Sequence, residues 1–451
     1  MDYITPVKKA PKIIANVANK FLGFSEKWRL SNRVIIKNGR VIDPLNKIDE
    51  YMDLSVMNGK IECIESDIIP RKGDALIDAS GFLVLPGLID IHLHLHDLFE
   101  VSTKPIIEAT THGVTSAVTP GAGNTLMAPS LLAAEVDRGL PLNVGCLIGA
   151  AAALAPRATI EEKINFFKGE MEDEKALNVI SRNPITNRTA PFAIGIKEHM
   201  GHYILSDENI DELFELTSKA NLYFMSHTQC PDHAERIVDL SKGRPIHLGH
   251  ATAAAAGTHG DPVKSLERVI NLIKKNSNVS GEFVTSHLRP SRGNKDGILI
   301  DAQAQEVALE ALKKGYVKIL ISDGQSDALM KGFGDTRDNI PAILELAERN
   351  ILTLSDAIAL MTSNPASLLS ERTSQEWWKK EIGNLSPGSR ADIILVDPIE
   401  KEVYASFVNG RIVSFEGRLI REGYGAGGLL TRRGIIDNTG VGYSNIIEYN
   451  V

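Results

Sequence analysis

Two histidines at the spacing of a β-strand are the strongest chemical signal in the chain. His92 and His94 follow the segment Pro86-Gly-Leu-Ile-Asp-Ile, and His96 comes two residues later. Side chains at positions i and i+2 of a strand point to the same face, so His92 and His94 should project together. Two converging imidazoles suit a borderline-soft cation such as Zn²⁺. The competing interpretation is a pair of buried, hydrogen-bonded histidines.

The elements around these histidines predict a parallel barrel. Between about residues 86 and 384, strand-like apolar runs alternate with helix-like stretches. The expected strands are LIDIHLH, GVTSAVT, LNVGCLIGA, FAIGIK, LYFMSH, PIHLGHA, VSGEFVTS and VKILISD. The fold class is therefore α/β, a (β/α)8 TIM-type barrel. His92 and His94 then lie at the C-terminal end of the first strand, where barrel enzymes keep their chemistry.

The two ends of the chain share a β-rich texture that differs from the middle. Short β-type runs alternate with turns, and Asn38-Gly39, Asn58-Gly59 and Asn409-Gly410 are hairpin signals. We expect one small β-sandwich domain assembled from both chain ends. The expected organisation is an N-terminal extension (1–32), the first part of the sandwich (33–85), the barrel (86–384), and the second part with a C-terminal tail (385–451).

The pattern PGLID-HxH after a β-rich segment resembles the amidohydrolase superfamily, particularly its dihydroorotase, hydantoinase and enamidase-like branch. Asn364-Pro365-Ala366 continues the resemblance, and residues 382–392, IGNLSPGSRAD, resemble the family's return from barrel to sandwich. The resemblance covers about Arg33 to Leu419. It implies a metal-dependent hydrolase that cleaves a carbon–nitrogen bond other than a peptide bond. The implied substrate is a small amide, either cyclic or an N-acyl compound.

The resemblance also implies metal ligands at the ends of later strands. Lys197 ends FAIGIK, and His227 ends LYFMSH 30 residues later. His250 follows after 23 more residues, and Asp323 ends VKILISD 73 residues further on. A barrel of ~250 residues with eight βα units averages about 30 residues per unit. These positions fit strands four, five, six and eight.

The superfamily pattern implies a role for each of these residues. A carboxylated Lys197 would bridge two divalent cations through its carbamate, because a bare ammonium offers no lone pair. Asp323 would also take a proton from the bridging hydroxide as it attacks, and pass it to the leaving nitrogen. Zn²⁺ is the expected metal, with Mn²⁺ or Fe²⁺ as alternatives. The implied ligands are His92, His94 and Asp323 on the first cation, His227 and His250 on the second, and Lys197 between them.

Several of these positions have rivals nearby. His247 is three residues from His250, so the two are expected on opposite faces of the strand, and the family's pattern favours His250. The other rivals are His199 and His202 for the bridging lysine, and Asp327 for the aspartate that closes the last strand.

Weaker signals mark residues that would contact substrate. His96 continues the face of the histidine pair, where dihydroorotase-like relatives hold an arginine that grips a carboxylate, which puts that substrate in doubt. Asn124 lies in GVTSAVTPGAGNT, which resembles the second-strand region whose asparagine touches substrate. His287, Arg289 and Arg292 follow the seventh strand, and the arginines would hold an anionic group. Solvated loop charges are the competing interpretation.

The sequence after His227 departs from the mononuclear deaminases of the superfamily. Those relatives place a catalytic glutamate in an HxxE-like pattern, whereas here no acid follows before Asp232. Together with Lys197, this favours amide hydrolysis at a two-metal site. The alternatives are a mononuclear deaminase or amidohydrolase, and a non-catalytic scaffold relative. Scaffold relatives usually lose metal ligands, but all six positions are filled here.

Composition and charge limit the kinds of molecule that this protein is expected to bind. The 451 residues carry a formal net charge of −8, which favours neither nucleic acid nor an anionic membrane. Three widely spaced cysteines without a CxxC motif predict neither a disulfide framework nor a thiolate zinc site. No apolar stretch is long enough to cross a bilayer. We expect a cytoplasmic homo-oligomer that acts on a small molecule.

Overall fold

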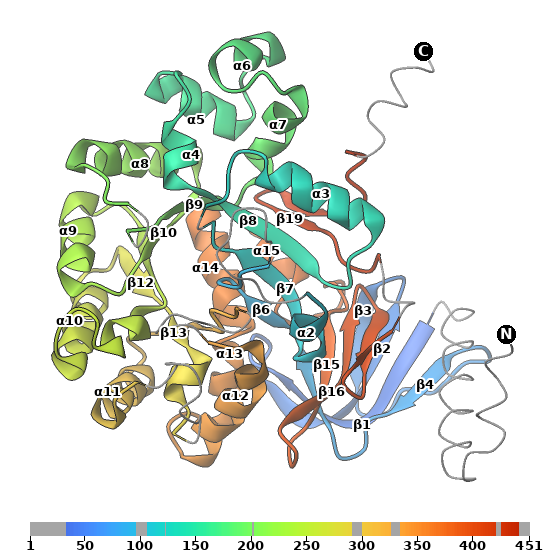
Figure 1. Ribbon diagram of the computed structural model, residues 1–451. Helices are drawn as coiled ribbons and strands as arrows, with labels where there is room; N and C mark the ends of the chain where they lie inside the picture. Colours follow the sequence, from blue (N-terminus) through green and yellow to red (C-terminus); the bar gives the residue numbers. More distant parts are fainter. Residues whose placement is uncertain are drawn as a thin grey trace, which may run out of the picture.

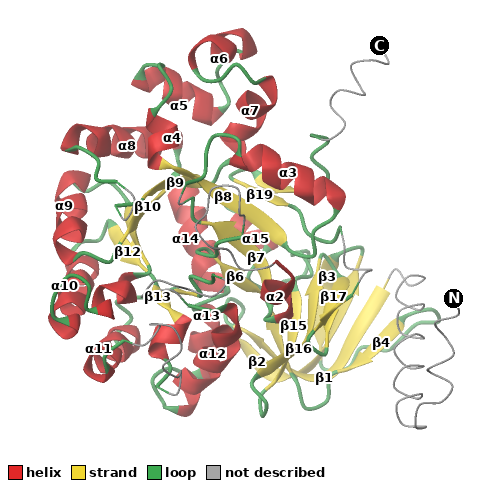
Figure 2. Ribbon diagram, viewed as in Figure 1, coloured by secondary structure: helices red, strands yellow, loops and turns green. Residues whose placement is uncertain are grey.

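A computed structural model describes residues 33–95, 106–121, 123–200, 203–290, 300–325, 334–420 and 425–441. These residues form a barrel of parallel strands ringed by helices, with a β-rich unit against one side (Figures 1 and 2). The expected N-terminal extension lies outside the described residues, as do His96, His202, Arg292 and Asp327. Among the described helices, none has the length and apolarity needed to span a membrane.

Each of the eight segments predicted as barrel strands contains a strand. They are β6 (Leu88–Asp90), β7 (Val114–Thr119), β8 (Asn143–Gly149), β9 (Gly195–Glu198), β10 (Tyr223–His227), β11 (Ile246–Gly249), β12 (Val279–Gly281) with β13 (Phe283–Val284), and β14 (Leu320–Ile321). Neighbours from β6 to β12 pair in parallel, as do β13 and β14. A parallel bridge between Leu93 and Gly324 joins the segments that follow β6 and β14. The predicted TIM-type barrel is therefore confirmed.

Alternation along β10 shows how a strand aims its last residue at the barrel interior. Tyr223 and Met225 belong to the apolar cluster inside the barrel, whereas Phe224 packs in the cluster between strands and helices. His227 shares the inward face because it continues the same period of two. The chemistry at the end of this strand is therefore placed by its apolar pattern.

Helices surround the barrel (Figure 1). They are α2 (Ile106–Thr111), α3 (Ala128–Arg138), α4 (Ala150–Leu154), α5 (Ile160–Lys168), α6 (Asp173–Val179), α7 (Pro184–Thr189), α8 (Asp207–Ala220), α9 (Pro231–Ser241), α10 (Pro262–Lys275), α11 (Ala302–Lys313), α12 (Asn339–Glu348), α13 (Leu354–Ala359), α14 (Ser363–Thr373) and α15 (Trp377–Glu381). Helix α10 shows why they form: Asp261 caps its first turn by accepting from the backbone N–H of Lys264. Its buried Leu266, Val269 and Ile273 recur at helical spacing and face the strands. By contrast, α14 and α15 pack against the apolar cluster inside the barrel (Figure 1).

The two ends of the chain build one nine-stranded mixed sheet with its own apolar core. Its strands are β1 (Arg33–Asp43), β2 (Ile48–Met57), β3 (Lys60–Glu65), β4 (Ala75–Asp78) and β5 (Leu83–Pro86), then β15 (Ile393–Asp397), β16 (Glu402–Val408), β17 (Arg411–Phe415) and β18 (Arg418–Leu419). The antiparallel pairing of β5 with β15 joins the two ends. The β-rich unit from both chain ends is therefore confirmed.

Two of the three predicted hairpin turns are present. Asn58-Gly59 and Asn409-Gly410 have positive φ at both residues, which two-residue hairpins of the favoured twist require. The hairpin predicted at Asn38-Gly39 is wrong. These residues form a bulge within the continuous strand β1, where the N–H of Asn38 donates to the Asp53 carboxylate. At this bulge Asn38 has positive φ, and Gly39 lies so close to Val84 that a Cβ would clash with it.

The last described segment returns to the barrel. Strands β19 (Leu429–Thr431) and β20 (Gly434–Ile436) form a hairpin, and β19 pairs with β8. The buried Arg432 guanidinium donates to the carbonyl oxygens of Ala220, at the end of α8, and of Phe167, near the end of α5. Cationic donors at helix C-termini satisfy carbonyls that have no partner within the helix. The C-terminal segment thus ties helices to the barrel.

Candidate metal centre

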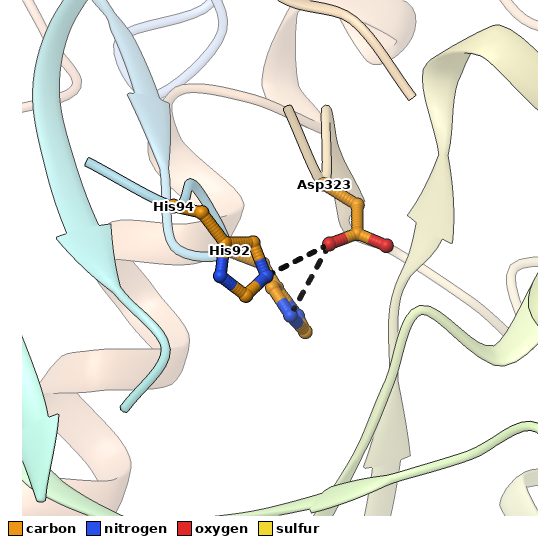
Figure 3. A group of neighbouring side chains, drawn as sticks. All are labelled: His92, His94 and Asp323. Carbon is orange, nitrogen blue, oxygen red and sulfur yellow. Dashed lines mark ion pairs between the residues drawn. The ribbon is translucent and has the colours of Figure 1, made fainter. Parts of the chain in front are cut away.

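A buried group of His92, His94 and Asp323 lies where β6 and β14 end (Figure 3). One ligand-type atom from each residue lies within 4.8 Å of the others. Nε2 of His94 is 3.3 Å from Oδ1 of Asp323, and Nε2 of His92 is 3.6 Å from the same oxygen. The two histidines therefore face one carboxylate, as their spacing of two predicted.

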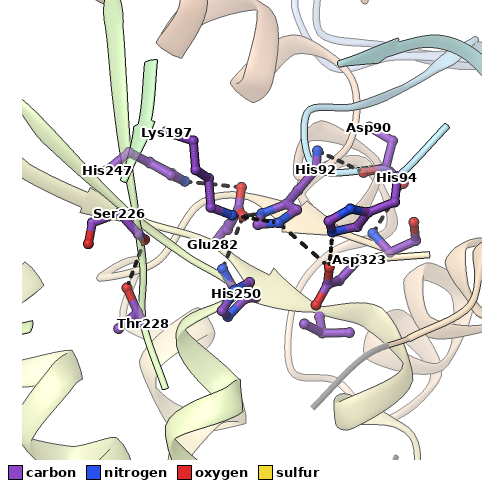
Figure 4. Close-up of polar contacts among 12 residues, drawn as sticks. Asp90, His92, His94, Lys197, Ser226, Thr228, His247, His250, Glu282 and Asp323 are labelled. Carbon is purple, nitrogen blue, oxygen red and sulfur yellow. Dashed lines mark hydrogen bonds and ion pairs between the residues drawn. The ribbon is translucent and has the colours of Figure 1, made fainter. Parts of the chain in front are cut away.

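Lys197 and His250 lie beside this group (Figure 4), and His227 packs against His250. Nζ of Lys197 lies 2.9 Å from Nε2 of His92, inside the barrel. The ring centroid of His250 is 5.0 Å from that of His92 and 4.5 Å from that of His227. All six residues that the resemblance implied as ligands therefore lie in one buried region at the C-terminal ends of the strands.

The donor atoms of this region fit a divalent cation. Oδ2 of Asp323 and Nδ1 of His227 and of His250 are buried without a hydrogen-bond partner. Oδ1 of Asp323 faces the rings of His92 and His94. Buried polar atoms without a partner cost free energy, so their gathering in one place calls for a ligand. Imidazole nitrogens and carboxylate oxygens are ligands of Zn²⁺ and of related divalent metals.

Electrostatics hold the histidines in the neutral form that binds metal. Burial lowers the pKa of His92 and of His250, and it lowers the pKa of His227 to about 3. The charge on Lys197 lowers all three pKa values further. Although burial raises the pKa of Asp323, the nearby His92, His94 and Lys197 lower it overall. A neutral imidazole and an ionised carboxylate are the ligating forms.

The backbone at two of these residues is strained. His250 has φ +39° and Asp323 has φ +47°, in the left-handed region that side chains other than glycine seldom adopt. Such strain persists where surrounding structure enforces it, and it clusters at functional sites. The prediction that His247 and His250 point to opposite faces of the strand is wrong. Both rings lie inside the barrel, because the left-handed residue breaks the alternation of the strand.

His247 differs from His250 in the use of its ring nitrogens. Its Nδ1 pairs with Oγ of Ser280 at 2.8 Å, and its Nε2 pairs with Oε2 of Glu282 at 3.1 Å. Both nitrogens are therefore engaged within the protein. The rival His199 lies beside His227, with ring centroids 4.6 Å apart. Asp232, the first acid after His227, is exposed and pairs with Arg268.

Two buried carboxylates that the sequence analysis did not assign hold the site together. Asp90 accepts from the backbone N–H of His92 at 3.2 Å and of Ser322 at 3.1 Å, which joins the ends of β6 and β14. Burial raises the pKa of Asp90 to about 7. Glu282 contacts His92, His247 and the backbone of His250. Glu282 is the one acidic residue in the strand-like segment VSGEFVTS, and this unusual position could have marked it as functional from the sequence.

The residues expected to contact substrate have varied surroundings. The Asn124 side-chain amide donates to the Leu147 carbonyl at 3.1 Å, inside the barrel wall. His287 is buried, its Nδ1 pairs with Oγ1 of Thr252 at 2.9 Å, and its Nε2 has no partner. The Arg289 guanidinium is held by the carboxylates of Asp338 and Glu345. Of these residues, His287 has a buried polar atom left over for a ligand.

Comparison with known proteins agrees with this fold and site. The profile of the Amidohydrolase family matches residues 83–413. A dihydroorotase of Geobacter metallireducens is 23% identical over 413 residues, which cover 81% of this chain and 90% of that protein. The structure of a D-hydantoinase matches with a TM-score of 0.68 at 18% identity, covering 89% of this chain and 99% of that one. A dihydropyrimidinase from Brevibacillus agri NCHU1002 matches with a TM-score of 0.66 at 17% identity, covering 90% and 99%.

At such identities the structural matches establish the fold alone, whereas the family profile spans most of the chain. The profile contains the barrel, the buried His–Asp group and the strand β15 that leads back to the β-rich unit. The resemblance first indicated by PGLID-HxH is confirmed. The chain belongs to the amidohydrolase family, and it is a hydrolase of carbon–nitrogen bonds other than peptide bonds.

Proposed function

We propose that this enzyme is a binuclear metal-dependent hydrolase of a small amide, either a cyclic amide or an N-acyl compound. The observation that carries the proposal is the convergence of six side chains from five different strand ends into one buried region. Their buried oxygen and nitrogen atoms without partners fit a divalent cation. The names of the matched dihydroorotase, D-hydantoinase and dihydropyrimidinase point to ring amides as the first substrates to test.

The proposed ligands fall into the sets that the superfamily pattern implies. His92, His94 and Asp323 would hold one cation, and His227 and His250 would hold the other. When bound, two divalent cations would lower the pKa of a water molecule and polarise the substrate carbonyl. Zn²⁺ is the proposed metal, because the set is rich in imidazole; Mn²⁺ and Fe²⁺ accept the same donors.

Asp323 is the proposed proton carrier. Its carboxylate is buried, its pKa is lowered by His92, His94 and Lys197 against the effect of burial, and its Oδ1 faces Nε2 of His92 and of His94. An ionised carboxylate in this position would take a proton from the attacking water and pass it to the leaving nitrogen. The protonated nitrogen would then separate from the carbonyl carbon as a neutral group, which completes cleavage of the carbon–nitrogen bond.

Lys197 is the proposed bridge, as a carbamate formed with CO₂. As an ammonium it lies among imidazoles whose pKa values its charge lowers. Carboxylation removes that positive charge and supplies an anion with two oxygens. An anion between two cations offsets their mutual repulsion, which is strong in a site with little water.

A mononuclear deaminase or amidohydrolase is the second candidate. Among the described residues, the group compact enough to share a single ion is His92, His94 and Asp323. A single cation on this triad would leave Lys197 unmodified. The non-catalytic scaffold alternative has no such support, because every expected ligand position is filled.

Metal analysis combined with a substrate screen tests the proposal. Elemental analysis of purified protein should give about two divalent ions per chain, and one ion would favour the mononuclear candidate. The metal-loaded enzyme should then be screened against dihydroorotate, hydantoins, dihydropyrimidines, N-acyl amino acids and aminopurines. Turnover of a ring amide or an N-acyl compound is the expected result. Release of ammonia from an aminopurine, without amide cleavage, would contradict the proposal.

Three further expectations stay predictions. They are substrate contacts by His96, Asn124, His287, Arg289 and Arg292; the division at residues 33–85, 86–384 and 385–451; and a cytoplasmic homo-oligomer. Of the substrate contacts, His287 has the best support, because its Nε2 is buried and without a partner.

A further inference from the structure

Glu282 is a fully buried acid at the centre of the metal region. It lies between β12 and β13, in the break of the seventh barrel strand, and its side chain has no exposed surface. Removing a carboxylate from water is costly unless it is paired and hydrogen-bonded. The hydrogen-bond partners of the Glu282 carboxylate therefore indicate its role in the fold (Figure 4).

The first partner is the ring of His92. Nδ1 of His92 forms a hydrogen bond with Oε1 of Glu282. An ionised carboxylate only accepts, so Nδ1 carries the proton and Nε2 keeps its lone pair. That Nε2 faces Nζ of Lys197 and Oδ1 of Asp323. Glu282 thus fixes both the tautomer and the ring orientation that a metal ligand needs.

The second partner is the backbone of His250. Its N–H donates to the same oxygen, Oε1, at 3.0 Å. This is the residue whose left-handed backbone turns its ring toward His92 and His227. A hydrogen bond to a buried carboxylate offsets the cost of that conformation. One oxygen of Glu282 therefore holds a proposed ligand of each cation.

The other carboxylate oxygen of Glu282, Oε2, is held by His247. Nε2 of His247 pairs with Oε2 at 3.1 Å, and Nδ1 of His247 is held by Ser280. With both oxygens engaged, the carboxylate has little freedom to rotate. His247 is therefore the support of Glu282 and not a ligand.

We propose that Glu282 is a positioning residue that sets the affinity of both metal sites, through the ring of His92 and the backbone turn at His250. The proposal rests on the proposed function, because it assigns His92 and His250 to different cations. Acidic partners of ligating histidines typically account for a factor of about 10–100 in metal affinity. Here one acid should affect two ions together, which distinguishes it from a partner of a single ligand.

Glu282→Gln is the variant that tests this, because it removes the charge and keeps the shape. Apoprotein should be titrated with Zn²⁺ in competition with a chelator, and affinity for both ions should fall by about 10–100-fold. Proton NMR of the apoprotein should show a strongly downfield Nδ1–H signal, assigned by its absence in His92→Gln. That signal should move upfield in Glu282→Gln. Both readouts are independent of turnover.

Glu198→Gln is the matched control. Glu198 is equally buried, ends β9, accepts from Oγ of Ser226 at 2.7 Å and lies 3.2 Å from Nε2 of His233. It should lose comparable thermal stability and keep native metal affinity. If Glu282→Gln does not fold, Glu282→Asp provides a second variant, because it keeps the charge on a shorter side chain. Its affinity for both metal ions should also fall.

The outcomes separate the two proposals. Native protein that binds two ions and hydrolyses an amide, with unchanged affinity in Glu282→Gln, would overturn the role of Glu282 alone. An equal loss of metal in Glu198→Gln would overturn it as well, because burial alone would then explain the effect. Native protein that binds fewer than two ions would instead contradict the binuclear function.

Discussion

Nζ of Lys197 lies 2.9 Å from Nε2 of His92, inside a barrel where both side chains are buried. Two histidines on other strands, His227 and His250, also have their pKa values lowered by this lysine. A positive charge next to so many ligand-type nitrogens opposes cation binding. Modification of the lysine to an anion would reverse that effect, and this makes Lys197 the sharpest test of the two-metal proposal.

Lys197→Ala should lose much of its bound metal and nearly all activity, because the anionic bridge is gone. A short carboxylic acid in the medium should restore part of the activity by occupying the vacated space. Lys197→Arg should not be rescued, since guanidinium stays protonated and fills the space with positive charge. Metal content and turnover with and without added acid are the measurements. An unmodified Lys197 in a high-resolution map of metal-replete protein would favour the mononuclear candidate.

Changing His92 or His94 to Ala should lower bound metal and turnover together while the barrel still folds. Each removes an imidazole that faces Asp323, and the remaining set cannot complete a site. Elemental analysis and circular dichroism of the same samples are the measurements. The exposed His259 gives a control, because His259→Ala should change neither quantity. Full metal occupancy in His92→Ala would show that the central assignment is wrong.

Asp323→Asn should reduce kcat by at least about 10²-fold, with a smaller effect on metal affinity, because general acid–base steps contribute typically about 10²–10⁴-fold. The amide has nearly the same size, so the strained backbone at this residue should be kept. Steady-state kinetics at saturating metal give the comparison. If kcat fell only about two- to threefold, the activation free energy would have changed by only about RT. Asp327 would then be the better candidate for the proton carrier.

Arg289→Met separates a structural role from substrate binding. The guanidinium pairs with Asp338, which is buried, and with Glu345, so its loss removes an ion pair from each carboxylate, although Ser286 still donates to Asp338. We expect a loss of about 1.5–3 kcal/mol in the free energy of unfolding, the range for hydrogen bonds to charged groups. Urea unfolding measures this, and the exposed Arg418→Met should be neutral. A large rise in KM with unchanged stability would favour the substrate contact instead.

The local pattern of the sequence was sufficient to predict the strands, and the family resemblance then named the residues at their ends as candidate ligands. Apolar runs at period two and helical stretches at period 3.6 reflect which face of each element is buried, and this is a local property. Because parallel strands in a barrel end at one rim, side chains at five strand ends were expected to meet. His227 illustrates this, since Tyr223 and Met225 already fix its inward face.

The partners of buried charges were decided by the tertiary structure. Glu282 and His92 are 190 residues apart in the chain, and Asp90 and Ser322 are 232 apart. No local period encodes such pairs, because they depend on which strands become neighbours after the barrel closes. The left-handed turn at His250 has the same origin, as its backbone N–H is held by Glu282 from the next strand. Sequence therefore determined which residues reach the rim, and long-range packing determined which atoms of those residues are left for a metal.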